Sequence, residues 1–210
     1  MTKGIFITFE GGEGAGKSTQ VKKLAEYLKE KGIDSVLTRE PGGSPGAEEI
    51  RSVILSGKKD KWDSLSEILL FSAARRNHLT QVIWPNIDAG KWVICDRFAD
   101  STMAYQGYGR NDNLLTQKDI QSLYKLIAGE FKPDITFILD IPPEEGLKRA
   151  FDRGTTNRME DMDMSFHHNL RKAFLDIARQ EPDRCVVLDA RKSPDALHEE
   201  IITVLRKRFL

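Results

Sequence analysis

The feature that most constrains this chain is a glycine-rich segment near the N-terminus, which separates a short apolar run from an amphipathic one. Residues 11–18 read GGEGAGKS and match the pattern G-x-x-x-x-G-K-[ST]. From average composition, a chance match in a chain of this length is expected in about one case in a hundred. Glycines let successive backbone amides turn toward one anion, and a helix that starts at the end of the loop adds its positive pole. The segment therefore predicts a site for nucleotide phosphates rather than an ordinary turn.

Two positions of this loop have a specific chemical role if the ligand is ATP. Lys17 is long enough to reach the β- and γ-phosphates, and the hydroxyl of Ser18 is suited to hold Mg²⁺. The remaining contacts to ATP are expected from the loop and the start of the helix: Gly11, Gly12, Glu13, Gly14, Ala15, Gly16 and Thr19. Many functions share such a loop, so it does not identify the group that accepts a phosphate.

Apolar strands and amphipathic helices alternate along the rest of the chain. Short apolar, β-branched runs predict five strands, at residues 4–9, 35–38, 92–95, 135–139 and 186–188. Apolar residues at helical spacing predict helices at 18–31, 47–55, 64–85, 116–128 and 166–179, and from 142 and 193 onward. This alternation implies an α/β fold, in which one five-stranded parallel sheet carries helices on both faces. We expect residues 1–210 to form a single domain.

Two helix starts are marked by capping signals. Ser64 and Glu67 match a capping box, and the helix that they open is expected to end near Pro85. Thr116 and Asp119 resemble a cap of the same kind at the start of a later helix.

The composition narrows the classes of function. Lysine and arginine total 32, as do aspartate and glutamate, so the zero net charge gives no electrostatic reason to expect a nucleic acid partner. No apolar run is long enough to span a membrane, and the apolar stretch before the glycine loop is too short for the h-region of a signal peptide. We therefore expect a soluble, cytoplasmic protein. Cys95 and Cys185 lie in strand-like runs and are expected to be buried thiols. The four histidines show no ligand spacing, so no metal is assigned to them.

Arginines near predicted loops are the conspicuous candidates for binding a second substrate. A guanidinium group can donate two parallel hydrogen bonds to a phosphate. The arginines in question are Arg39, Arg51, Arg75, Arg97, Arg149, Arg153 and Arg158. A GTPase would carry a guanine-reading Asn-Lys-x-Asp segment after a later strand, and the sequence has none.

Seven short segments carry a more specific pattern in their order and spacing. They are residues 9–18 (FEGGEGAGKS), 38–43 (TREPGG), 49–51 (EIR), 70–75 (LFSAAR), 96–98 (DRF), 101–107 (STMAYQG) and 132–134 (KPD). Together they resemble the segments of bacterial thymidylate kinases along almost the full chain. The resemblance implies a three-layer P-loop kinase fold and transfer of the γ-phosphoryl group of ATP to thymidine monophosphate (dTMP) with Mg²⁺, in dTTP synthesis. It also implies a homodimer, joined through helices beside the acceptor site.

The same resemblance implies roles for residues of the acceptor site. Arg51 and Arg97 are expected to bind the acceptor phosphate. Phe71 is expected to stack on thymine, and Arg75, which shares its helix face, to donate to a thymine carbonyl. The stretch that reads the base and crowds the place of a ribose 2′-hydroxyl contains Ser101, Tyr105 and Gln106. Structural roles stay open as alternatives: a solvated helix face for Arg51, a core position for Phe71 and loop packing for Tyr105.

Catalytic roles are implied for Lys17, Asp96, Glu10 and Arg153. Lys17 and Asp96 are expected beside the reacting phosphates, with Asp96 a candidate second ligand of Mg²⁺, and Glu10 near the sugar and the metal. The structural alternatives are a helix N-cap for Asp96 and a sheet-edge carboxylate for Glu10. Glu40 is typical of the family, but the sequence assigns no role to it.

A short polar stretch between two helices, at about residues 149–160, is predicted to close over the site as a lid. In the relatives that this sequence resembles, the phosphate loop lacks arginine and the lid supplies it. Here the loop carries Glu13, which agrees with that pattern. Arg153 is the first choice for the transition-state arginine, and Arg149 and Arg158 are secondary. A solvated, charged helix end is the structural alternative.

Three other functions stay open at this stage. The chain could phosphorylate another nucleotide or nucleoside, act as an ATP-dependent switch for a partner protein, or bind nucleotide without catalysis. The presence of Lys17, Ser18, Asp96 and Arg97 disfavours the last of these. The pairing of Phe71 with an arginine on one helix face favours thymine among the bases.

Overall fold

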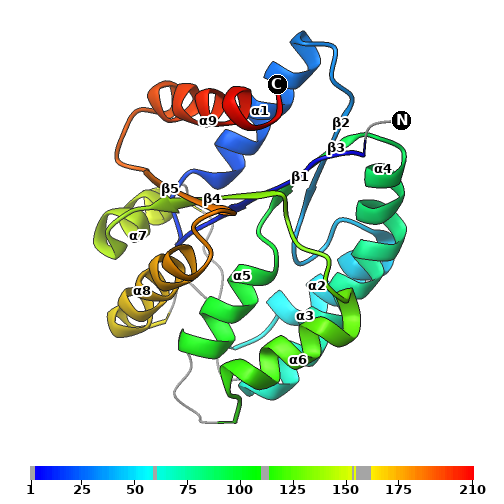
Figure 1. Ribbon diagram of the computed structural model, residues 1–210. Coiled ribbons are helices and arrows are strands. Elements are labelled where there is room, and N and C mark those ends of the chain that lie inside the picture. Colours follow the sequence, from blue (N-terminus) through cyan, green and yellow to red (C-terminus); the bar gives the residue numbers. More distant parts are fainter. Residues whose placement is uncertain (1–2, 59–60, 110–113, 153, 155–161) are drawn as a thin grey trace.

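A parallel sheet organises the structure. The computed structural model describes residues 3–58, 61–109, 114–152, 154 and 162–210, and within them five strands form one all-parallel sheet in the order β2-β3-β1-β4-β5 (Figure 1). The strands are β1 (Phe6–Glu10), β2 (Ser35–Arg39), β3 (Trp92–Asp96), β4 (Ile135–Asp140) and β5 (Cys185–Asp189). The predicted α/β class and the five predicted strands are confirmed, with small shifts at the strand ends.

The strand sequences explain how the sheet is buried. Every residue of β1 is buried; Ile7 and Phe9 join one core cluster, and Phe6 joins another. Successive side chains of a strand point to opposite faces, so a continuous apolar run fills the cores on both sides of the sheet. Cys95 of β3 and Cys185 of β5 are free, buried thiols, as predicted; Cys95 lies in the same cluster as Phe6, and Cys185 lies in a third core cluster.

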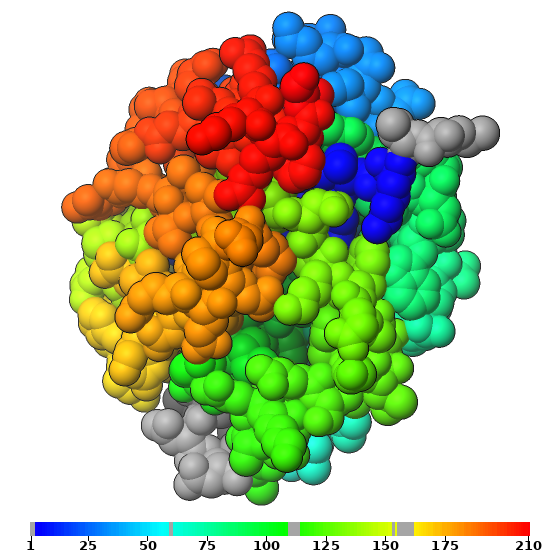
Figure 2. Space-filling model, viewed as in Figure 1, coloured from blue at the N-terminus to red at the C-terminus, as the bar shows by residue number. Residues whose placement is uncertain are grey.

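Helices cover both faces of the sheet and give three layers. On one face α1 (Lys17–Glu30) packs against α9 (Pro194–Phe209) (Figure 1). The surface of α9 is the red area in the upper part of the space-filling view (Figure 2). The other helical segments are α2 (Pro45–Leu55), α3 (Ser64–His78), η1 (Leu79–Ile83), α4 (Trp84–Asp88), α5 (Ala99–Thr102), η2 (Met103–Gly109), α6 (Gln117–Ala128), α7 (Pro143–Asp152) and α8 (Met164–Gln180). Of these, α8, η1 and α4 build the core on the opposite face. No helix in the described part of the chain is both long and apolar enough to cross a membrane.

The start of α3 differs from the predicted capping box. Asp63 is the N-cap residue, and its Oδ1 accepts a hydrogen bond from the helix backbone at 2.6 Å. Ser64 is the first helical residue and is buried, as is Glu67, so the prediction that these two form a capping box is wrong. A carboxylate at the N-cap also interacts favourably with the positive helix end. Thr116 and Asp119 do form the capping box predicted for α6.

The helical path that was predicted to end near Pro85 passes this proline and ends three residues later, at Asp88. The wide π-helical segment η1 follows α3, and α4 then continues to Asp88. In η1 the backbone N of Trp84 donates to O of Leu79, five residues earlier. A proline ring crowds the carbonyl four residues before it, and a widened turn gives that ring room. The wide turn thus lets the helix pass a residue that ordinarily ends it.

The carboxyl ends of the strands place charged residues along one edge. The strand register sets Arg39 of β2 beside Asp96 of β3, and Asp140 of β4 beside Asp189 of β5. Glu10 ends β1, the central strand. Ligands of open parallel sheets bind in the crevice at this edge, so the fold sets a site beside the loop that follows β1.

Candidate active site

The phosphate loop joins β1 to α1 and depends on glycine where it meets α7. Gly14 has a φ angle of 67°, in the left-handed region that favours glycine. A Cβ atom at Gly14 would lie 1.9 Å from O of Gly146, and one at Gly146 would lie 2.4 Å from O of Glu13. The loop can therefore approach α7 only because both facing residues lack side chains. No sequence signal pointed to Gly146, since this contact joins distant parts of the chain.

Lys17 is folded back onto the loop. Its Nζ donates hydrogen bonds to O of Gly11 at 3.0 Å and to O of Gly12 at 2.7 Å. Burial, together with the charge of Arg97, lowers the pKa of Lys17 to about 8. Phosphate oxygens are charged acceptors and bind an ammonium group more strongly than carbonyls do. The lysine is thus held at the loop by bonds that a phosphate can replace.

Ser18 and Asp96 bring two oxygen atoms together beside the loop. Oγ of Ser18, in the first turn of α1, donates to Oδ2 of Asp96, at the end of β3, over 2.5 Å. Mg²⁺ binds oxygen ligands, uses one or two protein groups and completes its shell with water and phosphate. The hydroxyl and the carboxylate fit that ion. The N-cap of the following helix α5 is Phe98, so the N-cap alternative for Asp96 does not hold.

Arg97 combines a left-handed backbone with a side chain that makes three hydrogen bonds. Its φ angle is 68°, and its N donates to O of Phe9 at 2.9 Å. Nη1 donates to O of Gly11 at 3.0 Å and Oγ of Ser101 at 3.2 Å, and Nη2 donates to Oε1 of Glu13 at 2.9 Å. A left-handed conformation costs a non-glycine residue about 1–2 kcal/mol, and such residues cluster at functional sites.

Glu13 links the phosphate loop to the acceptor side. Its Oε1 accepts hydrogen bonds from Nη2 of Arg97 and, at 2.7 Å, from the hydroxyl of Tyr105. Burial alone would raise the pKa of Glu13, but the charges of Arg97 and Lys17 and the Tyr105 bond lower it to about 2. Glu13 is therefore ionised at neutral pH.

One cavity joins the loop to the predicted acceptor residues. Its volume is about 500 Å³, within the range of small-molecule sites. The predicted site residues in its wall are Glu13, Gly14, Ala15, Gly16, Lys17, Ser18, Thr19, Arg51, Phe71, Arg75, Asp96, Arg97, Ser101, Tyr105 and Gln106. The structure thus brings together residues from the loop, α1, α2, α3, the end of β3, α5 and η2. Arg39, one of the candidate arginines for the second substrate, also lines the cavity, as do Glu40 and Thr102, to which the sequence assigned no role.

Neighbouring groups hold the basic and aromatic side chains of the acceptor side. Nη1 of Arg51 donates to O of Pro41 at 2.6 Å. The ring of Tyr105 lies 5.1 Å from the Arg97 guanidinium carbon and packs edge-on against Phe166. Tyr105 belongs to the helical segment η2, so the alternative of a loop that packs its own aromatic does not describe it.

Arg75 and Glu40 form a buried ion pair. Each side chain is 4% exposed, and Nε of Arg75 donates to Oε2 of Glu40 at 2.6 Å. Nη2 of Arg75 donates to O of Phe98 at 3.1 Å and to Oγ1 of Thr102 at 2.9 Å. The role that the sequence left open for Glu40 is therefore to hold Arg75. Gln106, which is also buried, donates to Oε2 of Glu67.

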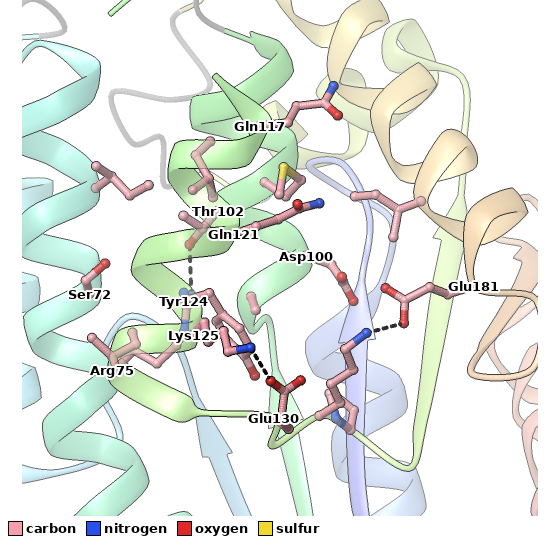
Figure 3. A pocket seen from close by; sticks show the side chains of 18 of the residues that line it. Ser72, Arg75, Asp100, Thr102, Gln117, Gln121, Tyr124, Lys125, Glu130 and Glu181 are labelled. Atoms are coloured by element: carbon pink, nitrogen blue, oxygen red, sulfur yellow. Dashed lines mark hydrogen bonds and ion pairs between the residues drawn. The ribbon is translucent and has the colours of Figure 1, made fainter. Parts of the chain in front are cut away.

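A second cavity of about 300 Å³ lies next to the same arginine. Figure 3 shows Arg75 bonded to Thr102 at its edge, with Gln121 and Tyr124 of α6 in its wall. The green surface of α6 and the orange surface that follows α8 lie on either side of a hollow in Figure 2. Arg75 and Thr102 line both cavities, so these two side chains form a shared wall.

Glu10 lies outside the wall of the main cavity. Its carboxylate is fully buried, and Oε1 accepts from N of Phe98 at 2.7 Å and from N of Ser101 at 3.2 Å. Oε2 accepts from Oγ of Ser101 at 2.5 Å. Burial, with the charge of Asp100, raises the pKa of Glu10 to about 7. The contacts of Glu10 hold the start of α5 and favour the structural alternative for this residue.

Only part of the predicted lid is described. Nη1 of Arg149, in the last turn of α7, donates to O of Ala190 at 2.8 Å. Arg153 and Arg158 lie outside the described residues. Of the three predicted lid arginines, the structure therefore places only Arg149, one of the two secondary candidates.

The site and the fold together define a class of protein. A parallel sheet with a phosphate loop after its first strand, and an Asp-Arg pair that faces this loop across one cavity, is the arrangement of a P-loop phosphotransferase. The family model described as thymidylate kinase matches residues 9–201. The chain therefore belongs to the thymidylate kinase family.

Similar proteins match over essentially the whole chain. The thymidylate kinase of Caulobacter vibrioides is 50% identical over 209 residues, which cover 100% of this chain and 99% of that protein. The thymidylate kinase of Bradyrhizobium diazoefficiens is 49% identical, with 99% of this chain and 91% of that protein covered. The crystal structure of thymidylate kinase from Ehrlichia chaffeensis matches with a TM-score of 0.80 and 40% identity, covering 98% of this chain and 99% of that one.

Proposed function

We propose that this protein transfers the γ-phosphoryl group of ATP to dTMP and releases dTDP and ADP, a step toward dTTP. The family supports both the donor and the acceptor. The observation that carries the proposal is the cavity of about 500 Å³, in which the phosphate loop faces Phe71, Arg75 and Arg97.

The chain's residues act by positioning and by charge. The loop amides and Lys17 bind the β- and γ-phosphates, and Lys17 leaves the two loop carbonyls to do so. Arg51 and Arg97 bind the phosphate of dTMP and direct its oxygen at the γ-phosphorus, in line with the departing ADP. These cations also offset the repulsion between two anionic substrates. No covalent intermediate forms on the protein.

The base is held on the other side of the cavity. Phe71 stacks on thymine, Arg75 donates to a thymine carbonyl, and the base and sugar are bounded by Ser101, Tyr105 and Gln106. Within the described residues, Nη1 of Arg75 forms no hydrogen bond, which leaves this nitrogen as the donor for the base. Glu10 supports the site indirectly, by fixing the backbone at Ser101.

Ser18 and Asp96 are the residues that would hold Mg²⁺. When bound, this ion would offset the negative charge that develops on the phosphates during transfer. The two side-chain oxygens lie close enough together to serve one ion.

A lid at about residues 149–160 completes the site, and the whole chain works as one domain. In this proposal Arg153 supplies the transition-state charge and Arg158 assists it. Arg149 leaves its bond to Ala190 if it joins them.

We also propose that two copies form a homodimer through α2, α3 and α6. The three helices are neighbours, since α3 contacts both α2 and α6. They carry large exposed apolar side chains, which are Val53, Leu65, Leu69 and Leu126. Exposed apolar groups gathered on adjacent elements are typical of an association surface.

A coupled ADP-release assay with a panel of acceptors tests the proposal. We expect the highest kcat/KM with dTMP, and lower values with dUMP, dCMP, UMP and free thymidine. ADP release that no monophosphate stimulates would instead support the switch hypothesis. A preference for another monophosphate would reassign the acceptor.

A further inference from the structure

We propose that His78 is a positioning residue for base selection, which sets the direction of Arg75 through Glu40 and thereby the preference for thymine over cytosine. The inference rests on the proposed function, in which Arg75 donates to the base. It deepens that function by assigning the selection to a buried chain of side chains, none of which except Arg75 contacts the base.

The chain of contacts runs from β2 to Arg75. Oγ1 of Thr38 lies 2.6 Å from Nε2 of His78, and Nδ1 of His78 lies 3.0 Å from Oε1 of Glu40. The other oxygen of Glu40 accepts from Nε of Arg75. His78 is fully buried, and Glu40 and Arg75 are nearly so. Water therefore has little access to replace any of these bonds.

Both oxygens of Glu40 are needed to hold its carboxylate in one orientation. A carboxylate can only accept, so Nδ1 of His78 donates to Oε1 while Nε of Arg75 donates to Oε2. Without His78, Oε1 would be a buried, unpaired acceptor, which is unfavourable, or the carboxylate would rotate toward Arg75 to find a donor. Rotation would displace the Nε bond, which is one of the three bonds that fix the direction of the guanidinium.

The surroundings of His78 hold its ring in place. When Nδ1 of a neutral histidine ring donates, Nε2 can only accept. Nε2 of His78 therefore accepts from the hydroxyl of Thr38, a residue of β2. A Cβ atom at Gly43 would lie 2.3 Å from Oγ1 of Thr38 and 2.4 Å from Nε2 of His78, so this glycine lets the loop close over their bond. Glu40 is fixed from its backbone as well, since its N donates to O of Asp96 at 3.0 Å.

The direction of Arg75 decides which base fits. Three of its contacts engage Nε and Nη2, and Nη1 is left for the ligand. A guanidinium group can only donate, so Nη1 suits the O4 carbonyl of thymine and opposes the 4-amino group of cytosine. A displacement of about 1 Å at such a contact can cost about a hundredfold in rate. A residue that holds the guanidinium in place thus controls base choice from a distance.

The test compares His78→Leu with His78→Asn. The amide nitrogen of Asn is separated from the backbone by as many bonds as Nδ1 of His, so Asn at position 78 can still donate to Glu40. Leu has a shape similar to that of Asn but carries no hydrogen-bond donor. For His78→Leu we expect the ratio of kcat/KM for dTMP to that for dCMP to fall by about tenfold or more. The KM for dTMP should rise, while kcat and the KM for ATP stay within about twofold. His78→Asn should recover most of the ratio.

A matched control is His198→Leu, on α9 away from the cavity, which should leave the ratio unchanged. If folded His78→Leu keeps the normal ratio, or if its KM for ATP rises as much as that for dTMP, the inference is overturned. If His78→Leu does not fold, Thr38→Val decides, since it removes only the hydroxyl at Nε2. A lowered ratio in Thr38→Val supports the inference, and an unchanged one overturns it.

Arg75→Lys separates this inference from the proposed function. If Arg75→Lys leaves the dTMP to dCMP ratio unchanged, Arg75 does not read the base and its proposed role fails. If Arg75→Lys lowers the ratio while the His78 and Thr38 variants do not, only the positioning role of His78 fails.

Discussion

Nη2 of Arg97 lies 2.9 Å from Oε1 of Glu13, so a carboxylate of the phosphate loop holds the guanidinium proposed to bind the acceptor phosphate. The hydroxyl of Tyr105 donates to the same oxygen. In the proposed function, the phosphate of dTMP would replace the carboxylate of Glu13 as the anion bound to Arg97. The donor and acceptor sides are thus joined by an ionic contact.

Replacing Arg97 with lysine keeps the charge and removes the planar fork. Lysine cannot make the two-nitrogen contact that binds a phosphate in a fixed direction. For Arg97→Lys we expect the KM for dTMP to rise about tenfold, which corresponds to about 1.4 kcal/mol of binding, and the KM for ATP to change little. Steady-state kinetics measure both values. Arg179→Lys, on the exposed side of α8, is the matched control. Equal dTMP affinity in Arg97→Lys and the wild type would remove Arg97 from the acceptor site.

Glu13 should make stability depend on pH in the acid range. Its pKa is lowered from 4.5 to about 2, so the ionised carboxylate stabilises the folded state above about pH 4.5, and this contribution is lost as the pH falls toward 2. The full contribution corresponds to about 3 kcal/mol, of which about 2 kcal/mol should be lost between pH 7 and pH 3. Urea unfolding of the wild type and Glu13→Gln should show the gap between them narrowing over that range. A gap that stays constant would contradict the ionic contact with Arg97.

Lys17 should be required for phosphoryl transfer but not for folding. Removing a preorganised donor of this kind costs about 10²–10³-fold in kcat. We expect Lys17→Ala to show that loss in the ADP-release assay while its thermal unfolding stays close to that of the wild type. Lys23→Ala, on the same helix and paired with Asp195, should keep normal kinetics. Wild-type turnover by Lys17→Ala would refute the mechanism.

The metal role of Ser18 predicts a change in the Mg²⁺ requirement. Without the hydroxyl, more free Mg²⁺ should be needed to reach half-maximal rate, because one protein oxygen is lost from the ion's ligands. We expect a shift of about tenfold for Ser18→Ala, measured as rate against free Mg²⁺ at fixed ATP. Ser122→Ala, on an exposed face of α6, serves as the control. An unchanged Mg²⁺ curve for Ser18→Ala would argue against this ligand.

The proposed dimer surface predicts an effect on size in solution. Leu69 of α3 is 52% exposed, and an arginine there would place a charge in an apolar interface. Sedimentation should show a dimer for the wild type and a monomer for Leu69→Arg. Val187→Arg, on the edge strand β5, should leave the wild-type state unchanged. A monomeric wild type would remove the dimer from the proposal.

Most of the fold could be predicted because its signals are local. Apolar runs and helical spacing predicted the strands and most helices, and the glycine pattern predicted the loop before α1. The failures came from choices between neighbouring signals. Asp63 and Ser64 can each cap a helix, and burial of Ser64 leaves the cap to Asp63. Pro85 ordinarily ends a helix, and the widened turn before it has no sequence signature.

The candidate site was predictable as a set of residues but not as a set of contacts. The motif and the resemblance selected Arg75 and Arg97, and both line the cavity. Neither showed that Glu40 holds Arg75, that Glu13 holds Arg97, or that His78 belongs to the same buried network. These partners lie on different elements, and their distances depend on how those elements pack.

The sequence by itself determined the order of strands and helices, the phosphate loop and the family, because periodicity, glycine spacing and motifs are properties of neighbouring residues. Only the tertiary structure decided which side chains share a cavity and which are held beneath it. Parallel strands bring the ends of distant segments to one edge. Whether a carboxylate there lines the cavity, like Asp96, or is buried as a support, like Glu10, depends on which neighbours cover it.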